Sequence, residues 1–221
     1  MNDQTSTVAL PSTNRTEAFS DAVIAIAITL LVLEIRVPAV GPHESLAHAL
    51  LHLWPKYATY AVSFLTIGVM WINHHALFER VARVDRRLLF VNIAVLMAIA
   101  FVPFPTAVLG DYLQDSNASR AASVLYGANM LLVGLGFLAL GLHLLSHPEL
   151  RQADFHDADV RSGLRRTLFG PAAYVVAIAV SFVNAYAALG IYAFVVIYFS
   201  VSQLSGLGRG RTVAPGAGMD R

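Results

Sequence analysis

Polar and charged residues divide the chain into long apolar stretches, at 18–37, 54–77, 88–109, 121–145, 168–187 and 190–207. Each is about as long as the 17 to 25 residues that a helix needs to cross a bilayer. The last two run together, because no Asp, Glu, Lys, Arg or His occurs between Thr167 and Gly208. One helix of that length would measure about 60 Å, twice the hydrocarbon thickness, so the segment must fold back. We expect the reversal at 184–190, where Gly190 provides backbone freedom.

The composition agrees with a lipid environment. Hydrophobic residues make up 57% of the chain and charged residues 13%, with a mean hydropathy of +0.62, which is too apolar for an ordinary soluble domain. We therefore predict an all-α, polytopic membrane protein with six transmembrane helices. A net charge of +1, spread over short loops, gives no reason to expect a nucleic-acid partner. The chain has no cysteine, which excludes disulfides and thiolate chemistry.

The basic residues predict the orientation. If the amino terminus is inside, twelve arginines fall in inner segments, and only Arg36, Lys56 and Arg120 fall outside. Inner loops retain Arg and Lys, so both termini are expected in the cytoplasm. Residues 1–14 and 209–221 are rich in Ser, Thr, Gly and Pro and are expected to be disordered tails around a membrane domain at 15–208. Arginine far outnumbers lysine, which indicates a GC-rich bacterial genome and a bacterial plasma membrane.

Polar groups from the first three predicted helices are expected at one depth. The first helix starts with Ser20 and Asp21, the second ends with polar residues at 71–75, and the third reaches Asn92 early. Polar side chains near hydrocarbon are costly unless they are paired. We expect Asp21 to accept hydrogen bonds from one or more of Ser20, Asn73, His74 and His75, and so to tie these helices together. In the simpler interpretation, Ser20 and Asp21 only complete the first turn of a helix.

Two motifs carry a family resemblance. Residues 15–21 read Arg-Thr-Glu-Ala-Phe-Ser-Asp, and residues 71–75 read Trp-Ile-Asn-His-His. With Asn92 and Pro103-Phe104-Pro105, they resemble the transmembrane protein 175 family of potassium channels. The resemblance covers 15–110, whereas the later spans match mainly in number and length. It implies that a set of signature residues holds the pore helix against its neighbours: Arg15, Phe19, Ser20, Asp21, Trp71, Asn73, His74, His75 and Asn92.

The first helix has an apolar face at steps of three and four, formed by Val23, Ile26, Leu30, Leu33 and Val37. Nearly all of its other residues are apolar too, so this periodicity leaves open which face would line a pore. The resemblance implies that Ile26 forms the narrowest ring, that Leu30 and Leu33 form further rings, and that the Thr29 hydroxyl lies beside them. It also implies a homotetramer with four first helices around the axis.

The resemblance implies a potassium-preferring cation channel. The chain lacks the Thr-Val-Gly-Tyr-Gly loop that supplies carbonyl rings in other potassium channels, so its selectivity must come from elsewhere. The hydrophobic rings that the resemblance implies could close a pore by excluding water and filter ions that shed part of their hydration shell. Potassium is the permeant ion, and no cofactor is expected. Glu34 could concentrate cations at the outer mouth, although a charge that merely reaches toward water is the simpler interpretation.

Two other classes of protein stay open. A proton-coupled carrier or proton pathway could use Asp21, His74 and His75 as a relay. A membrane scaffold would use the same polar groups only as structural contacts. Motifs of hydrolases, phosphate-binding loops and zinc proteases are absent, so we do not expect an enzyme. The pair His48 and His52 offers too few ligands for a metal, and the acidic residues at 154–159 alternate with arginines, so no metal site is expected.

Overall fold

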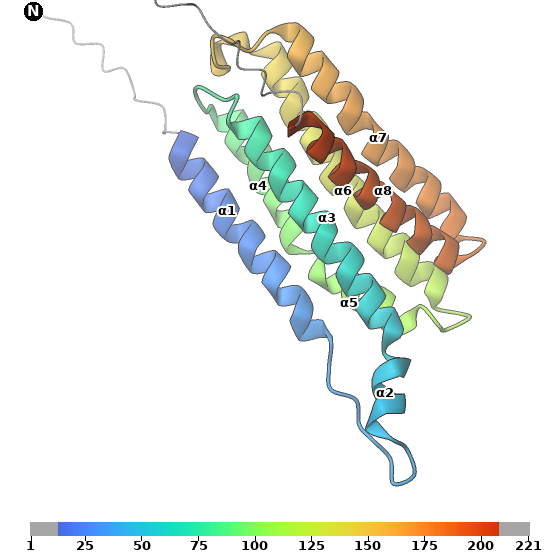
Figure 1. Ribbon diagram of the computed structural model, residues 1–221. Coiled ribbons are helices and arrows are strands. Elements are labelled where there is room, and N and C mark those ends of the chain that lie inside the picture. Colours follow the sequence, from blue (N-terminus) through green and yellow to red (C-terminus); the bar gives the residue numbers. More distant parts are fainter. Residues whose placement is uncertain (1–12, 208–221) are drawn as a thin grey trace, which may run out of the picture.

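The apolar stretches form helices that run side by side along one axis in the computed structural model (Figure 1). The structure describes residues 13–207, without the side chains at 157, 159 and 202–207. The predicted tail at 209–221 and residues 1–12 of the predicted tail at 1–14 lie outside the described residues. The long helices are α1 (Thr13–Leu30), α3 (Trp54–Phe78), α4 (Arg86–Ala100), α5 (Pro103–Tyr112), α6 (Ser119–Ser146), α7 (Asp157–Ser181) and α8 (Ala185–Leu207). The short elements are η1 (Leu31–Glu34), α2 (Leu46–His52) and η2 (Pro148–Leu150).

Four segments of the described chain are long and apolar enough to cross a membrane, at Thr13–Glu34, Trp54–Phe78, Arg86–Tyr112 and Ser119–Ser146. Helix α7 is long enough, but arginines in its first turns lower its hydropathy. The described apolar part of α8 is shorter, at Ala185–Val201. Because α7 and α8 run antiparallel and pack on α6, they complete the predicted six-helix, all-α membrane fold.

Helices α4 and α5 form one span with a break at Phe101 and Val102. The break has a local cause, because Pro103 and Pro105 lack the backbone N–H groups that would continue the hydrogen bonds of α4. Proline is tolerated in the first turn of a helix, where those groups have no intrahelical partner, so α5 starts at Pro103.

Three predicted boundaries are wrong by a few residues. The last reversal lies at 182–184 and not at 184–190, because Asn184 caps α8 with its side chain, which accepts from the amides of Tyr186 at 2.9 Å and Ala187 at 3.1 Å. Gly190 lies inside α8. Helix α1 begins at Thr13, inside the predicted tail, and its helical structure ends at Glu34 and not at residue 37.

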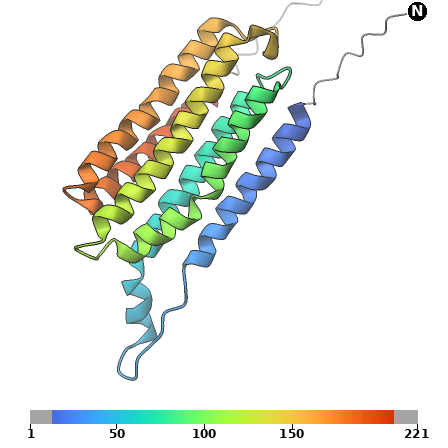
Figure 2. The ribbon, with the colours of Figure 1, turned by 180° about the vertical axis from the view of Figure 1, so that it is seen from behind.

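The helices are arranged so that α1 is the outermost element on one side (Figures 1 and 2). It packs mainly on α3 and α4, while α6 packs on α4, α5 and α7 in the interior of the bundle. One continuous apolar core extends from α1 to α8 and includes Leu31, Ile67, Leu109, Met130 and Val195. About half of the circumference of α1 is therefore not covered by the rest of the chain.

Candidate functional site

One face of α1 is buried against α3 and α4. It consists of Thr16, Ser20, Ile24, Ala27 and, in η1, Leu31. These residues recur at steps of three and four, so they lie on a single stripe of the helix. The stripe is apolar except near its first turns, where the two hydroxyl residues need hydrogen-bond partners once they leave water. This face decides which side of α1 points away from the bundle.

A buried chain of hydrogen bonds joins α1, α4 and α3. The amide nitrogen of Asn92 donates to Ser20 Oγ at 3.0 Å, and Ser20 Oγ donates to the carbonyl oxygen of Thr16 at 2.8 Å. The amide oxygen of Asn92 lies 2.8 Å from His74 Nε2, which carries the proton of this bond because an amide oxygen only accepts. All three side chains are buried, so each polar atom in the chain has found a partner where water is excluded.

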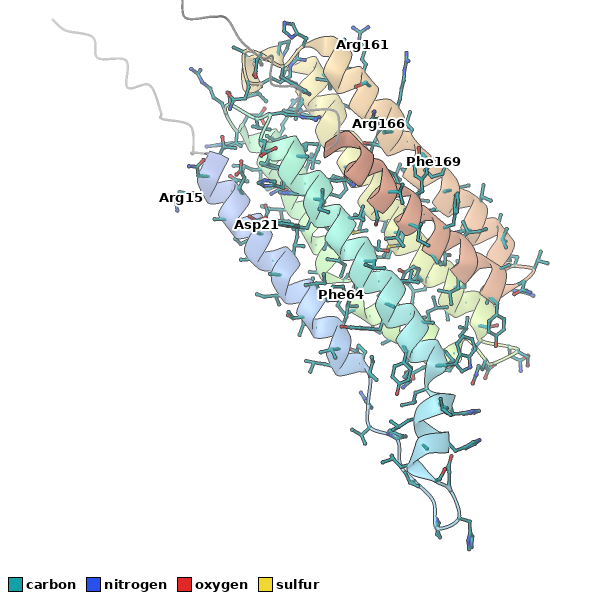
Figure 3. All side chains as sticks on the ribbon, in the orientation of Figure 1. Arg15, Asp21, Phe64, Arg161, Arg166 and Phe169 are labelled. Atoms are coloured by element: carbon teal, nitrogen blue, oxygen red, sulfur yellow. The ribbon has the colours of Figure 1, made fainter. Side chains whose placement is uncertain are left out.

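Asp21 has a different partner from the expected ones. Its carboxylate accepts a hydrogen bond from Trp71 Nε1 at 3.0 Å, and Trp71 stacks on His75 with ring centroids 6.1 Å apart. His75 in turn faces Glu79 at 3.4 Å. Consecutive helix residues point about 100° apart, so Ser20 and Asp21 cannot both face the interior. Asp21 thus ties α1 to α3 at the edge of the contact, as Figure 3 shows on the side of α1 near α3.

Three signature residues lie away from this tie. Asn73 is half-buried and lines a cavity on the opposite side of α3 from α1. Arg15 and Phe19 are exposed on α1, and Figure 3 shows Arg15 directed away from the bundle. Within one chain, Arg15 and Phe19 point away from the contact of α1 with α3 and α4, since the turn of the helix directs them elsewhere. The roles of Asn73, Arg15 and Phe19 in holding the pore helix stay predictions.

The predicted pore positions lie on the uncovered face of α1 and η1. Ile26 is 59% exposed, Leu30 42% and Leu33 68%, although they are large apolar residues. The Thr29 hydroxyl is on the same face and donates to the backbone carbonyls of Ala25 at 3.0 Å and Ile26 at 2.9 Å. Its lone pairs remain available as acceptors. Within one chain, none of the residues that the structure describes covers this face.

Glu34 lies on another face. It is half-buried and lines a narrow crevice with Lys56, Thr59 and Thr106, next to α3 and α5. The cause is the change from α-helix to 3₁₀-helix after Leu30, because residues i and i+3 of a 3₁₀-helix share a face. Glu34 therefore follows the buried Leu31, whereas in a continued α-helix it would follow the exposed Leu30. This placement argues against a role at the mouth of the uncovered face.

Sequence reasoning missed two buried polar clusters in the rest of the bundle. Ser63 lies 2.8 Å from the Thr106 hydroxyl and 3.1 Å from the Tyr126 hydroxyl, which joins α3, α5 and α6. Ser123 lies 2.8 Å from the Ser181 hydroxyl and accepts from Tyr192 through its carbonyl oxygen at 2.9 Å, which joins α6, α7 and α8. Hydroxyls inside the predicted spans were the available signal, since they need partners in hydrocarbon.

Comparisons with known proteins agree with this arrangement. The family model described as endosomal/lysosomal potassium channel TMEM175 matches residues 15–103, which contain most of α1, all of α3 and α4, and their polar tie. A potassium channel of Streptomyces collinus is 43% identical over 190 residues, which cover 86% of this chain and 92% of the relative. Over 114 residues, the chain is 40% identical to the endosomal/lysosomal proton channel TMEM175 of Gallus gallus, covering 48% of this chain and 23% of that protein.

A solved structure supports the relationship over the whole bundle. The crystal structure of a lysosomal potassium-selective channel TMEM175 homolog from Chamaesiphon minutus superposes with a TM-score of 0.77 and 39% identity, covering 86% of this chain and 97% of that one. The match therefore includes α6 to α8, for which the sequence motifs carried little information. The relatives are channels by name, in agreement with the expectation that the chain is not an enzyme. From its motifs, its fold and these relatives, the chain belongs to the TMEM175 family of ion channels.

Proposed function

We propose that this protein is a potassium-preferring channel in which α1 of each of four subunits lines a central pore. The observation that carries the proposal is the division of α1 into two faces. The Ser20–Asn92–His74 hydrogen bonds hold one face against the subunit, and the opposite face exposes the large apolar side chains of Ile26, Leu30 and Leu33. Four such faces around one axis would cover one another and form stacked apolar rings.

The apolar rings would block ions by excluding water from the pore. An apolar constriction excludes water when it is narrow, and a wider one passes ions that shed part of their hydration shell. Potassium sheds water more easily than sodium, so a modest preference for potassium follows. Because the Thr29 hydroxyl already donates to its own helix, it would offer only acceptor lone pairs to a passing cation.

We also propose that the protein lies in a bacterial plasma membrane with both termini in the cytoplasm. Nine of the described arginines lie at the end of the bundle that carries Thr13, and Arg36, Lys56 and Arg120 lie at the other end. This bias supports a cytoplasmic location for the arginine-rich end.

A reversal-potential measurement tests the proposal. Purified protein is placed in a planar bilayer with potassium on one side and sodium on the other. Unitary currents that reverse toward the potassium equilibrium potential are expected. Ile26→Asn should wet the constriction and raise the conductance, whereas the volume-conserving Ile26→Leu should keep it dry and leave the conductance close to that of the parent. An unchanged conductance in Ile26→Asn would remove Ile26 from the gate.

The second candidate is a proton pathway on the same helices. The proton channel named among the animal relatives favours it, as does the histidine buried beside α1. The relay through Asp21, His74 and His75 has less support, because Asp21 bonds to Trp71, His74 to Asn92, and His75 faces Glu79. Currents that reverse at the proton equilibrium potential would favour this candidate. The absence of any flux would favour a scaffold.

A further inference from the structure

The cavity that Asn73 lines lies inside the helix bundle, away from α1. It has a volume of about 490 Å³ and is enclosed by α3, α6, α7 and α8. Its inner part is lined mainly by apolar side chains, including Met70, Met130, Val133 and Val195. Its volume is in the range of sites that hold small organic ligands. Because its inner walls are apolar, an apolar group is the occupant that fits this cavity best.

The depth of this hollow matches one leaflet of a bilayer. Thr66 lines its inner part and Arg80 lines its outer part, fourteen residues later along α3 and the following turn. At the rise of an α-helix this separation is about 20 Å, which equals about half of the 40–45 Å that a bilayer measures with its head-group regions. The hollow thus runs from near the centre of the bundle to the end that carries Thr13 and Arg15.

The mouth of the hollow is positively charged. Arg80 and Arg166 line it, and Figure 3 shows Arg166 at the same end of the bundle as Arg15. The Arg80 side chain reaches α7, because a Cβ atom built on Gly163 would lie 3.9 Å from its Nη1. Arg166 is one turn further along the same face of α7. The two guanidinium groups therefore flank one opening.

The mouth is held in place by the backbone around it. The amide of Ala82 donates to the carbonyl oxygen of Leu150 at 2.8 Å, and the amide of Gln152 donates to that of Arg80 at 3.0 Å. The guanidinium of Arg80 also lies over the ring of Phe155, 4.7 Å from its centroid. Arg80 thus projects from a turn that is fastened to the loop after α6.

The arginines at the mouth are available to an anion. Among the side chains that the structure describes, neither Arg80 nor Arg166 forms an ion pair with a carboxylate. Arg80 and Arg166 also line an adjoining polar hollow of about 650 Å³, together with Glu79 and Asp154, and the Glu79 carboxylate faces His75. Guanidinium groups bind phosphate with two parallel hydrogen bonds, and basic pockets between transmembrane helices suit the head groups of anionic lipids.

We propose that this cavity is a binding site for an anionic phospholipid, with one acyl chain between α3, α6, α7 and α8 and the phosphate between Arg80 and Arg166. The site is distinct from the proposed ion pathway, because it lies on the opposite side of α3 from α1. It does not depend on which ion the channel conducts.

Native mass spectrometry of the purified full chain in detergent tests the proposal, with dioleoyl phosphatidylglycerol as the probe and dioleoyl phosphatidylcholine as the zwitterionic comparison. We expect saturable binding of one phosphatidylglycerol per subunit and much weaker binding of phosphatidylcholine. Arg166→Gln should weaken phosphatidylglycerol binding about tenfold, because it removes charge-assisted hydrogen bonds. Arg165→Gln is the matched control, since Arg165 is exposed on α7 and does not line the cavity.

A second variant tests the acyl chain. Ala76 lines the cavity, so Ala76→Phe should block binding while the unfolding temperature without lipid stays close to that of the parent. Equal binding of the two phospholipids, or equal losses in Arg165→Gln and Arg166→Gln, would overturn the proposal. So would undiminished binding in a folded Ala76→Phe variant. If oleate binds more tightly than phosphatidylglycerol and displaces it, the occupant is a free fatty acid and the phospholipid assignment is wrong.

Discussion

At the scale of single residues, Asn92 connects three helices through one amide. It donates to Ser20 on α1 and accepts from His74 on α3, and all three side chains are buried. A buried polar group that loses its partner keeps the full cost of its desolvation. The Asn92 amide therefore helps to hold α1 against α3 and α4, because its loss would remove a hydrogen-bond partner from buried polar groups on both α1 and α3.

We expect Asn92→Ala to lower the free energy of unfolding by about 1–3 kcal/mol, because it leaves the His74 Nε2–H group buried without its acceptor. Thermal unfolding of the purified protein in detergent measures the change. Ser146→Ala is the control, since that exposed hydroxyl bonds only to Leu142 of its own helix at 3.0 Å. The double variant with Ser20→Ala should be less destabilised than the sum of the two single variants. Strict additivity would contradict a coupled chain.

Asp85 has two roles in the arginine-rich end of the bundle. It caps α4 by accepting from the Leu88 amide at 2.7 Å, and it pairs with His143 on α6 at 3.0 Å. Burial alone would raise the pKa of the Asp85 carboxyl, but the Leu88 amide, the His143 hydrogen bond and the charges of His143 and His147 outweigh it, so the pKa is lowered. The carboxylate thus contributes stability above its ordinary pKa of about 4 and loses it as the pH falls through the lowered value.

Replacement of Asp85 separates these roles. Asp85→Asn keeps the cap, and its deficit in unfolding temperature relative to the parent should be present at pH 6 and shrink toward pH 3. Asp85→Ala also removes the cap, which should cost about a further 1 kcal/mol at every pH. Unfolding temperatures measured from pH 3 to pH 6 check both results. A deficit in Asp85→Asn that does not change with pH would show that the ion pair contributes nothing.

At the scale of elements, glycines let α6 approach its neighbours closely. A Cβ atom on Gly127 would overlap the Tyr192 hydroxyl on α8 and lie 2.7 Å from Ile178 Cγ1 on α7, and one on Gly136 would lie 2.5 Å from Val95 Cγ2 on α4. Small residues are the usual means by which membrane helices pack backbone to backbone. Helix α6 therefore packs closely on α4 on one side and on α7 and α8 on the other.

Gly127→Ala should destabilise the protein by about 1–3 kcal/mol, the usual cost of overpacking a well-filled interior. Gly190→Ala is the matched control within α8, because nothing lies within 4 Å of its Cβ position. Unfolding temperatures of the two variants in the same detergent provide the comparison. Similar losses in both would show that the contact of α6 with Tyr192 is not tight.

At the scale of the whole molecule, the proposed assembly follows from the uncovered face of α1. Ile26 lies on this face, whereas Ile24 is buried against the same subunit with 2% exposure. The chain has no cysteine, so a single introduced cysteine reports only on contacts between copies. A disulfide needs Cα atoms within about 7 Å, which the narrowest ring of a pore can provide.

Ile26→Cys should form disulfide-linked dimers on oxidation in the membrane, and Ile24→Cys should stay monomeric on a denaturing gel. Light scattering of the detergent-solubilised parent should give the mass of a tetramer. If Ile26→Cys remains monomeric while light scattering gives a tetramer, the subunits assemble through a face other than that of Ile26.

The class of protein, the six spans and the family could all be predicted from the amino-acid sequence. Length and hydropathy suffice for the spans, because in hydrocarbon a backbone must satisfy its hydrogen bonds within a helix. Residues 15–21 and 71–75 sufficed for the family, as the match over residues 15–103 confirms. The same residues predicted a tie between the first three helices, and Ser20, His74 and Asn92 form it.

The hydrogen-bond partner of each polar group could not be predicted from the sequence, because it depends on how the helices pack. Asp21 bonds to Trp71, and Glu34 turns toward α3 and α5. Neither contact could be predicted, because hydrophobic periodicity does not show which way a residue faces when nearly all of its neighbours are apolar. The same limit concealed the hollow behind Arg80 and Arg166, which depends on how α3, α6, α7 and α8 pack at a distance in sequence. Periodicity identifies a face only where polar and apolar residues alternate, and in this chain packing had to supply the rest.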